Sequence, residues 1–129
     1  MQTKGFTLIE LFVAVGILVF VLCGLLVLFN NCVFLNRTNR NLTIAMSHAQ
    51  YVMEDIKNTP SDQIAANIDA GVWNWNTDLQ FTNNNLIRLT NEAIITTYVL
   101  ASNPLQVSVV VTWDDPRPGL QTDLRSLFN

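Results

Sequence analysis

The chain has 129 residues, a formal net charge of −3 at pH 7 and seven Lys and Arg residues. These cations occur singly along the sequence, so there is no basic stripe of the kind that binds nucleic acid, and no nucleic-acid partner is expected. A chain of this length accommodates one domain beyond any membrane segment.

Residues 6–29 form an apolar run that contains a single charged residue, Glu10. At about 1.5 Å of rise per residue, a helix over this run spans roughly 36 Å, which is enough to cross the ~30 Å hydrocarbon core of a bilayer. The run therefore predicts a transmembrane helix in contact with membrane lipid. An ionised side chain inside such a helix costs roughly 2–3 kcal/mol and usually has a partner and a function. Glu10 is therefore a candidate functional residue.

The junction between Gly5 and Phe6, the polar leader with Lys4 before it and Phe6-Thr-Leu-Ile-Glu10 after it closely resemble the processing site of type IV pilins and type II secretion pseudopilins. The resemblance implies a leader peptide at residues 1–5, cleavage between Gly5 and Phe6 by prepilin peptidase, and N-methylation of Phe6. It also implies that Glu10 of one subunit meets the amino group of Phe6 in its neighbour during assembly. A carboxylate among packed apolar helices gains most from a nearby ammonium, which agrees with this role.

The same resemblance implies a location and a set of partners. We expect a single-pass protein of the bacterial inner membrane with its N-terminus in the cytoplasm, which later enters a periplasmic or extracellular filament. Its partners would be prepilin peptidase, other pilin or pseudopilin subunits and an inner-membrane assembly platform. A cleaved secretory signal fits poorly, because its apolar core is about 7–15 residues long. A plain single-span anchor explains the apolar run, but it explains neither Gly5 nor Glu10.

Two glycines and two cysteines lie in or near the predicted membrane helix. Gly16 and Gly24 are its possible weak points, because glycine is a poor helix former. Cys23 and Cys32 fall on opposite faces of a helix and about 13 Å apart along it, too far for a disulfide between them. Both cysteines are expected to pack as small hydrophobic residues.

An amphipathic helix is predicted to continue over residues 30–58, so that one long helix runs from about Phe6 to about Asn58. Apolar residues recur along it at spacings of three, four and seven. Pro60 ends the helix, because its ring disfavours helical backbone in the residue before it. Leu42, Ala49 and Ile56 are expected to face a sheet. His48 is interpreted as a surface or packing residue and not as a general base.

Residues 59–93 are rich in turn-forming Asn, Asp and Gly and are predicted to be a variable connecting region. Trp73 and Trp75 lie within it and are expected to cover the core. Residues 94–129 are predicted to form an antiparallel sheet with strands at 94–100, 105–113 and 120–128. The turn at 114–119 contains Asp114 and Asp115, which we interpret as solvated residues and not as calcium ligands, since calcium takes about six to eight oxygens. No metal or other cofactor is expected.

The C-terminal strands, Val-x-Val-x-x-Thr-Trp followed by a turn and Leu-x-Thr-x-Leu, resemble the meander of type IV pilus modification minor pilins and of minor pseudopilin I. The fold class implied is α+β and type IV pilin-like, with one long N-terminal helix packed on a small sheet. The function implied is that of a minor pilin or pseudopilin, a structural subunit and not an enzyme. A major pilin of a thin filament and a membrane-anchored extracytoplasmic binding domain are the alternatives.

Overall fold

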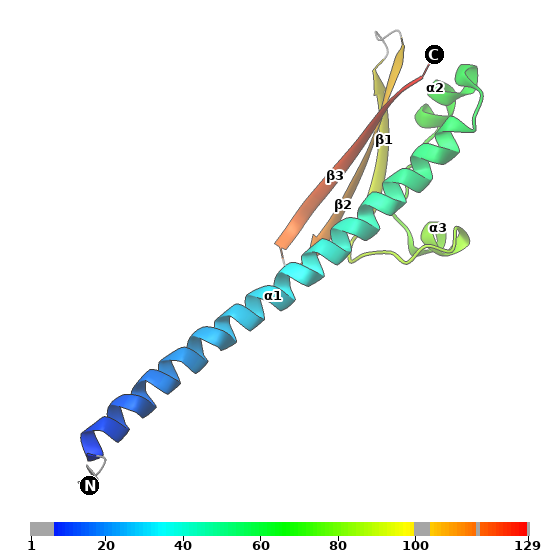
Figure 1. The fold of residues 1–129 in the computed structure, drawn as a ribbon. Helices are drawn as coiled ribbons and strands as arrows, with labels where there is room; N and C mark the ends of the chain where they lie inside the picture. The colour runs from blue at the N-terminus through cyan, green and yellow to red at the C-terminus, as the bar shows by residue number, and fades with distance from the viewer. Residues whose placement is uncertain (1–6, 100–103, 116, 129) are drawn as a thin grey trace. The chain divides into compact units, whose positions relative to one another are not determined.

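The computed structural model describes residues 7–99, 104–115 and 117–128, and it has an α+β layout in which a long N-terminal helix precedes a small antiparallel sheet (Figure 1). The elements in chain order are α1 (Leu8–Lys57), α2 (Ser61–Asp69), α3 (Asp78–Asn83), β1 (Ala93–Val99), β2 (Leu105–Asp115) and β3 (Arg117–Phe128). The chain divides into two compact units, residues 1–37 and residues 38–129, and α1 contributes to both.

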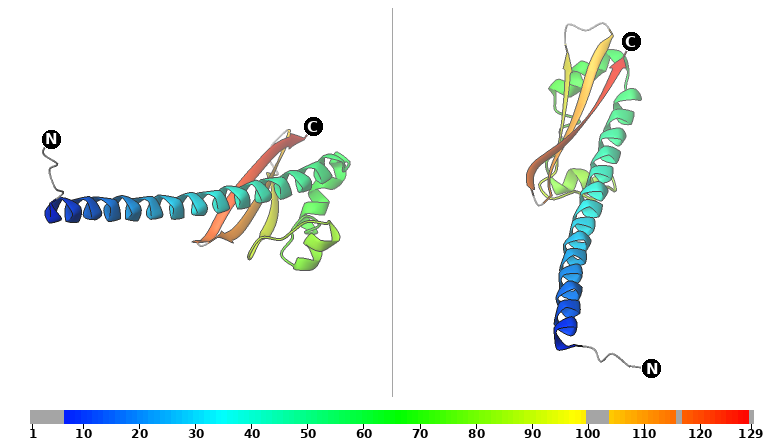
Figure 2. Two further views of the ribbon diagram at one scale, coloured as in Figure 1. Left: turned by 60° about the horizontal axis from the view of Figure 1, so that its bottom comes forward. Right: turned by 60° about the vertical axis from the view of Figure 1, so that its left-hand side comes forward.

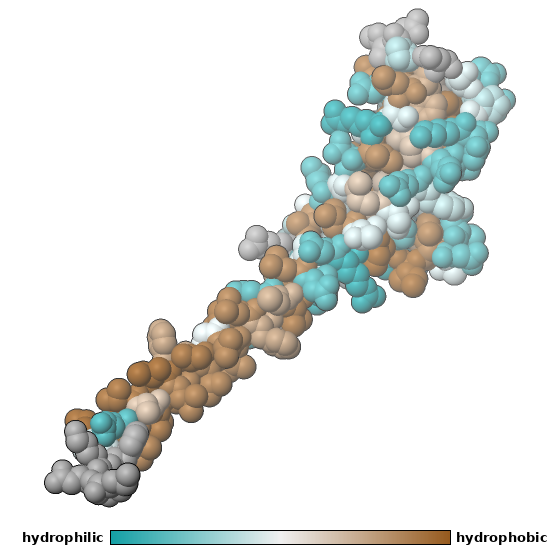
Figure 3. All heavy atoms as spheres, viewed as in Figure 1, coloured by the Kyte–Doolittle hydropathy of each residue, from teal (hydrophilic) through white to brown (hydrophobic). Residues whose placement is uncertain are grey.

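The first unit is the N-terminal part of α1. Every residue from Thr7 to Arg37 is exposed, and the apolar side chains among them are exposed by 42–81%. Figure 3 shows this part of the helix covered by hydrophobic side chains. α1 is long and apolar enough to be a candidate membrane span, as the sequence predicts. So much apolar surface on a single helix calls for lipid or other helices around it.

The second unit contains a three-stranded antiparallel sheet in the order β1-β2-β3. The central strand β2 alternates, so that Val107, Val109, Val111 and Trp113 are buried while the residues between them are half-buried. Figures 1 and 2 show residues 38–57 of α1 lying along one face of this sheet. The buried side chains of β2 belong to the same core cluster as those of α1. The three predicted strands are therefore present, each within a few residues of its predicted bounds.

The buried face of α1 is close to the predicted one, with one correction. Ala49 and Ile56 are fully buried, but Leu42 is 41% exposed. Leu42 lies two turns before Ala49 on nearly the same side of the helix, so its exposure marks the end of the cover that the sheet provides. The remaining buried residues of α1 are Ala45, His48, Val52 and Met53.

The connecting region at 59–93 is more regular than its composition predicts. It forms α2 and α3, with Ile64 and Ile68 of α2 and Phe81 of α3 buried in the core. Backbone bonds between Trp75 and Ile94 then attach the region to β1. The four-residue spacing of Ile64 and Ile68 was the helical signal within this Asn-rich and Asp-rich stretch.

The predicted turn at 114–119 is shorter than expected. β2 continues to Asp115 and β3 begins at Arg117, with an irregularity between Trp113 and Asp115. Asp115 is only 3% exposed, so the expectation that both aspartates are solvated is wrong for this residue. Asp114 is half-buried. β2 and β3 therefore extend into a segment that was predicted to be a loop from its Asp, Pro and Gly content.

Candidate functional site

The sequence-predicted site begins at the start of α1. Gly5 and Phe6, the expected cleavage junction, lie outside the described residues. Glu10 occupies the first turn of the helix, where its Oε2 accepts hydrogen bonds from the backbone N–H of Thr7 at 2.9 Å and from the Thr7 hydroxyl at 2.8 Å. The backbone N–H of Glu10 lies 3.4 Å from Oγ1 of Thr7. Thr7 and Glu10 thus form a reciprocal capping box.

This capping box explains why α1 begins at Leu8. Thr7 is the N-cap residue, and Glu10 at the third helical position satisfies a backbone donor that the helix would otherwise leave without a partner. A carboxylate in the first turn is also favoured by the helix dipole. Thr7 was missed in the sequence analysis, although the spacing Thr-x-x-Glu is the signature of this motif.

A shallow groove of about 290 Å³ lies beside Glu10 on the surface of α1. Its walls are the apolar side chains of Ile9, Val13 and Ile17, and Ala14 leaves the space between them. Glu10 borders this groove, so a second apolar helix that entered it would meet a carboxylate at one end. The carboxylate of such a site accepts an N–H donor or an ammonium.

The two glycines and two cysteines of this unit lie on a continuous helix. α1 runs through Gly16 and Gly24 without a break, and a Cβ at either position would meet nothing within 4 Å. Cys23 and Cys32 are free thiols with exposed side chains, so neither packs as a small hydrophobic residue within this chain.

In the second unit, His48 is buried and forms a pair with Glu92. Nδ1 of His48 lies 2.7 Å from Oε1 of Glu92, while Oε2 of Glu92 accepts the backbone N–H of Leu89 at 2.7 Å. The exposed fractions of the two side chains are 3% and 0%. His48 is therefore a packing residue, which is one of the two alternatives predicted for it, and it does not lie on the surface. The sequence gives no signal for Glu92, because a lone glutamate in a polar loop is normally solvated.

Arg88 completes the attachment of this loop. Its guanidinium donates to Oδ1 of Asp78 at 2.6 Å and to the backbone carbonyl of Glu92 at 2.8 Å. The same group lies 5.7 Å from the centre of the Phe81 ring. Because the His48 ring packs against the Phe81 ring, the cluster joins the loop before β1 to α1. These contacts are structural, and no nucleophile takes part in them.

Trp73 and Trp75 cover the core, as the sequence predicts. Both indoles are buried, and Nε1 of Trp73 donates to Oδ2 of Asp55 at 2.6 Å. Trp75 makes an edge-to-face contact with Phe81. Each indole therefore brings a large apolar area into the core while its N–H has a partner.

Asp114 holds the end of the β2–β3 hairpin. Its carboxylate accepts from the side chain of Asn91 at 2.8 Å and from the backbone N–H of Gly119 at 2.9 Å. These two bonds hold the pKa of Asp114 below its ordinary value, and the bond from Asn91 has the larger effect. Within the described ranges, no group of three or more His, Cys, Asp or Glu side chains is placed to hold a metal ion.

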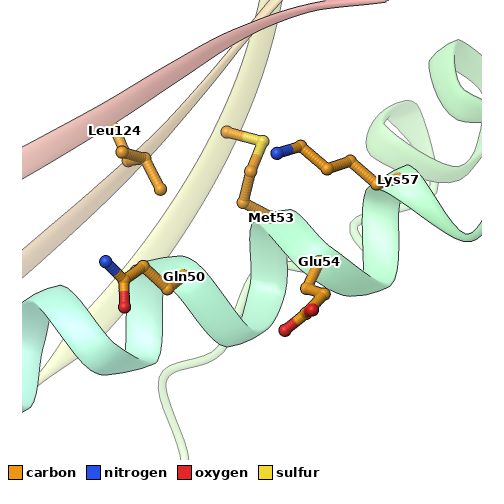
Figure 4. A pocket seen from close by; sticks show the side chains of 5 residues that line it. All are labelled: Gln50, Met53, Glu54, Lys57 and Leu124. Atoms are coloured by element: carbon orange, nitrogen blue, oxygen red, sulfur yellow. The ribbon is translucent and has the colours of Figure 1, made fainter.

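An open cavity of about 280 Å³ lies along the seam between α1 and β3. In Figure 4 the side chains of Met53 and Leu124 point toward one another across this seam. The other lining residues are Gln50, Glu54 and Lys57 of α1. The cavity thus combines a carboxylate, an ammonium and an amide with two apolar side chains.

In comparisons with known proteins, no family model, curated protein or solved structure matches this chain.

Proposed function

We propose that the chain is a minor pilin or pseudopilin, a structural subunit that prepilin peptidase cleaves after Gly5 and that is assembled into a type IV pilus or a type II secretion pseudopilus. The observation that carries this proposal is the position of Glu10. It lies in the first turn of a 50-residue helix whose residues up to Phe29 are all exposed and, apart from Glu10, carry no charge. A carboxylate at that place is unfavourable in lipid, and its presence there therefore indicates a functional role.

The capping box gives the subunit two alternative partners for one carboxylate. In the single chain, Oε2 of Glu10 is satisfied by the N–H and hydroxyl of Thr7. Cleavage before Phe6 would create an ammonium in each subunit, and an ammonium of a neighbour is a stronger partner than two neutral donors. Membrane insertion then uses the first set of bonds and assembly uses the second. The apolar groove beside Glu10 supports this exchange, because it admits a neighbouring helix.

The remaining parts of the proposal follow from this mechanism. The subunit resides in the bacterial inner membrane with its N-terminus cytoplasmic, and later in a periplasmic or extracellular filament. Its partners are the peptidase, the assembly platform and other subunits, and it carries out no reaction itself. The α+β layout, with a helix along one face of a small antiparallel sheet, supports a pilin-like fold.

The decisive experiment is the intact mass of the protein isolated from the membranes of its own host. A chain that begins at a methylated Phe6 is expected, and Gly5→Leu should leave the whole precursor, because the resemblance implies a peptidase that accepts only a very small residue there. Gly16→Leu is the matched control, since a side chain at that position has open space around it. Wild-type protein that still begins at Met1 would contradict the proposal.

A further inference from the structure

The sheet has one open edge, which is the outer side of β3. In the part of the chain that the structure describes, β3 pairs with β2 alone, along the register that joins Leu124 to Val109. The opposite edge is covered at Ile94 and Thr96, because Trp75 exchanges two backbone bonds with Ile94 and the side chain of Asn74 accepts the N–H of Thr96. An open edge of this length is a template for another strand.

The direction of the N–H groups at the β1 edge shows which backbone groups of β3 point away from the sheet. Ile94 and Thr96 direct their N–H groups away from β2, and in an antiparallel sheet this direction alternates from residue to residue. In the register, Ile95 lies opposite Val110 and Val109 lies opposite Leu124, so the same alternation places the N–H group of Ile95 toward β2 and that of Leu124 toward β2 as well. The residues of β3 whose N–H and C=O groups face outward are therefore Gln121, Asp123, Arg125 and Leu127.

Two of these four residues carry opposite charges on the same face of the sheet. Asp123 and Arg125 lie on the face away from α1, with 52% and 65% of their side chains exposed, and they bond to each other at 2.9 Å. We infer that this edge pairs with the same edge of a second copy of the chain. In an antiparallel pair centred on Leu124, Asp123 of each copy lies directly opposite Arg125 of the other.

On the face toward α1, the cross-strand neighbours in this register also match. Leu124 faces Leu124, Thr122 faces Ser126 and Leu120 faces Phe128 of the second copy, so apolar meets apolar and hydroxyl meets hydroxyl. On the outer face, Gln121 lies opposite Leu127, which is an unlike pair. Moving the centre to Asp123 or to Arg125 would place a charge opposite its own kind, which is unfavourable. The charges thus select one register among those that the open backbone groups allow.

Pairing in this register joins two three-stranded sheets into one. The two copies are related by a two-fold axis perpendicular to the sheet, so both α1 helices lie on the same face of the six strands. The cavity between α1 and β3 adjoins this new junction, and its Leu124 side chain, which is only partly buried in the single chain, gains cover there. Backbone bonds give the contact strength, while the charge pair gives it register.

β3 runs in the same direction as residues 38–57 of α1 (Figure 1). In an antiparallel pair of β3 strands, residues 38–57 of the two copies therefore also run in opposite directions.

The test uses full-length protein in lipid nanodiscs that each hold one copy, with disc pairing followed by sedimentation. Wild-type discs should pair in a concentration-dependent manner. Asp123→Arg and Arg125→Asp should each weaken pairing at least about tenfold, because like charges then face each other at both symmetric positions. An equimolar mixture of the two variants should recover wild-type pairing, since the two arginines of one copy face the two aspartates of the other.

The mixture separates the contact between copies from effects within one chain. Each variant loses the internal bond between residues 123 and 125, and mixing does not restore it, so recovery reports the intermolecular contact alone. Thr97→Arg, which adds a positive charge to the same outer face on β1, should leave pairing unchanged. The inference fails if wild-type discs stay single up to about 0.1 mM, if the single variants pair like wild type, or if the mixture pairs no better than either variant.

Discussion

Nδ1 of His48 lies 2.7 Å from Oε1 of Glu92, and this contact joins the middle of α1 to the loop that precedes β1. Both side chains are buried, so each satisfies a polar group that water cannot reach. Glu92 also accepts the backbone N–H of Leu89, which fixes the loop close to the helix. The position of β1 therefore depends on a pair of polar residues inside an apolar core.

We expect His48→Ala to destabilise the second unit by about 3–5 kcal/mol, because it leaves Glu92 buried without its side-chain partner. Glu92→Ala should cost a similar amount, and the double variant should cost clearly less than the sum of the two. Denaturant unfolding followed by tryptophan fluorescence gives these values. Additive effects would show that the two side chains act independently.

Ala49→Asp should destabilise the second unit by more than about 3 kcal/mol, because it places an unpaired charge at a fully buried position. Gln50→Asp is the matched control, since the neighbouring side chain is exposed and the change in charge is the same. Thermal unfolding of both variants makes the comparison. Equal stability of the two variants would mean that the buried face of α1 is wrongly placed.

Glu10→Ala should be inserted and cleaved normally but depleted from filaments. Removing the charge lowers the cost of insertion, whereas the subunit loses the group that meets its neighbour's ammonium. Glu10→Gln should behave similarly, because the amide keeps the shape without the charge. The measurement is the ratio of processed subunit in sheared filaments to that in the membrane. Wild-type ratios for both variants would exclude a role for Glu10 in assembly.

Asp114 should make stability depend on pH in the acid range. Its pKa is lowered in the folded chain by the bonds from Asn91 and Gly119, so its contribution is present above its ordinary value near 3.8 and is lost as pH falls through the folded value. Thermal midpoints of wild type and Asp114→Asn should therefore differ at pH 7 and converge toward pH 2. A constant difference across this range would contradict the assignment.

The parts of the fold that follow from periodicity could be predicted from the sequence. Local patterns predict these elements: the apolar run and the spacing of Ala45, Ala49, Val52 and Ile56 predict the helix, and the β-branched residues predict the strands. The parts that depend on long-range packing could not be. Glu92 lies 44 positions from His48, and its burial follows from where the loop meets α1, which no local pattern encodes.

The candidate site at the N-terminus was predictable in a similar, limited way. Glu10 is conspicuous because a charge in an apolar run is rare, so its residue type alone identified it. The role of Thr7 depends on its hydrogen bonds to Glu10. The Thr-x-x-Glu spacing that indicates such bonds is present in the sequence, but it overlaps the more prominent processing motif. The open edge of β3 required the strand order, since sequence alone does not say which strand lies outside.

The unequal edges of the sheet limit how far strands can add. A fibril built by strand addition needs two open edges on every molecule, so that each new copy presents a fresh one. Here Asn74 and Trp75 cover the β1 edge, and addition at β3 ends with a closed pair. The side chain of Asn74 thereby shields the backbone N–H of Thr96, and we expect its loss to leave that part of the β1 edge open to a further strand.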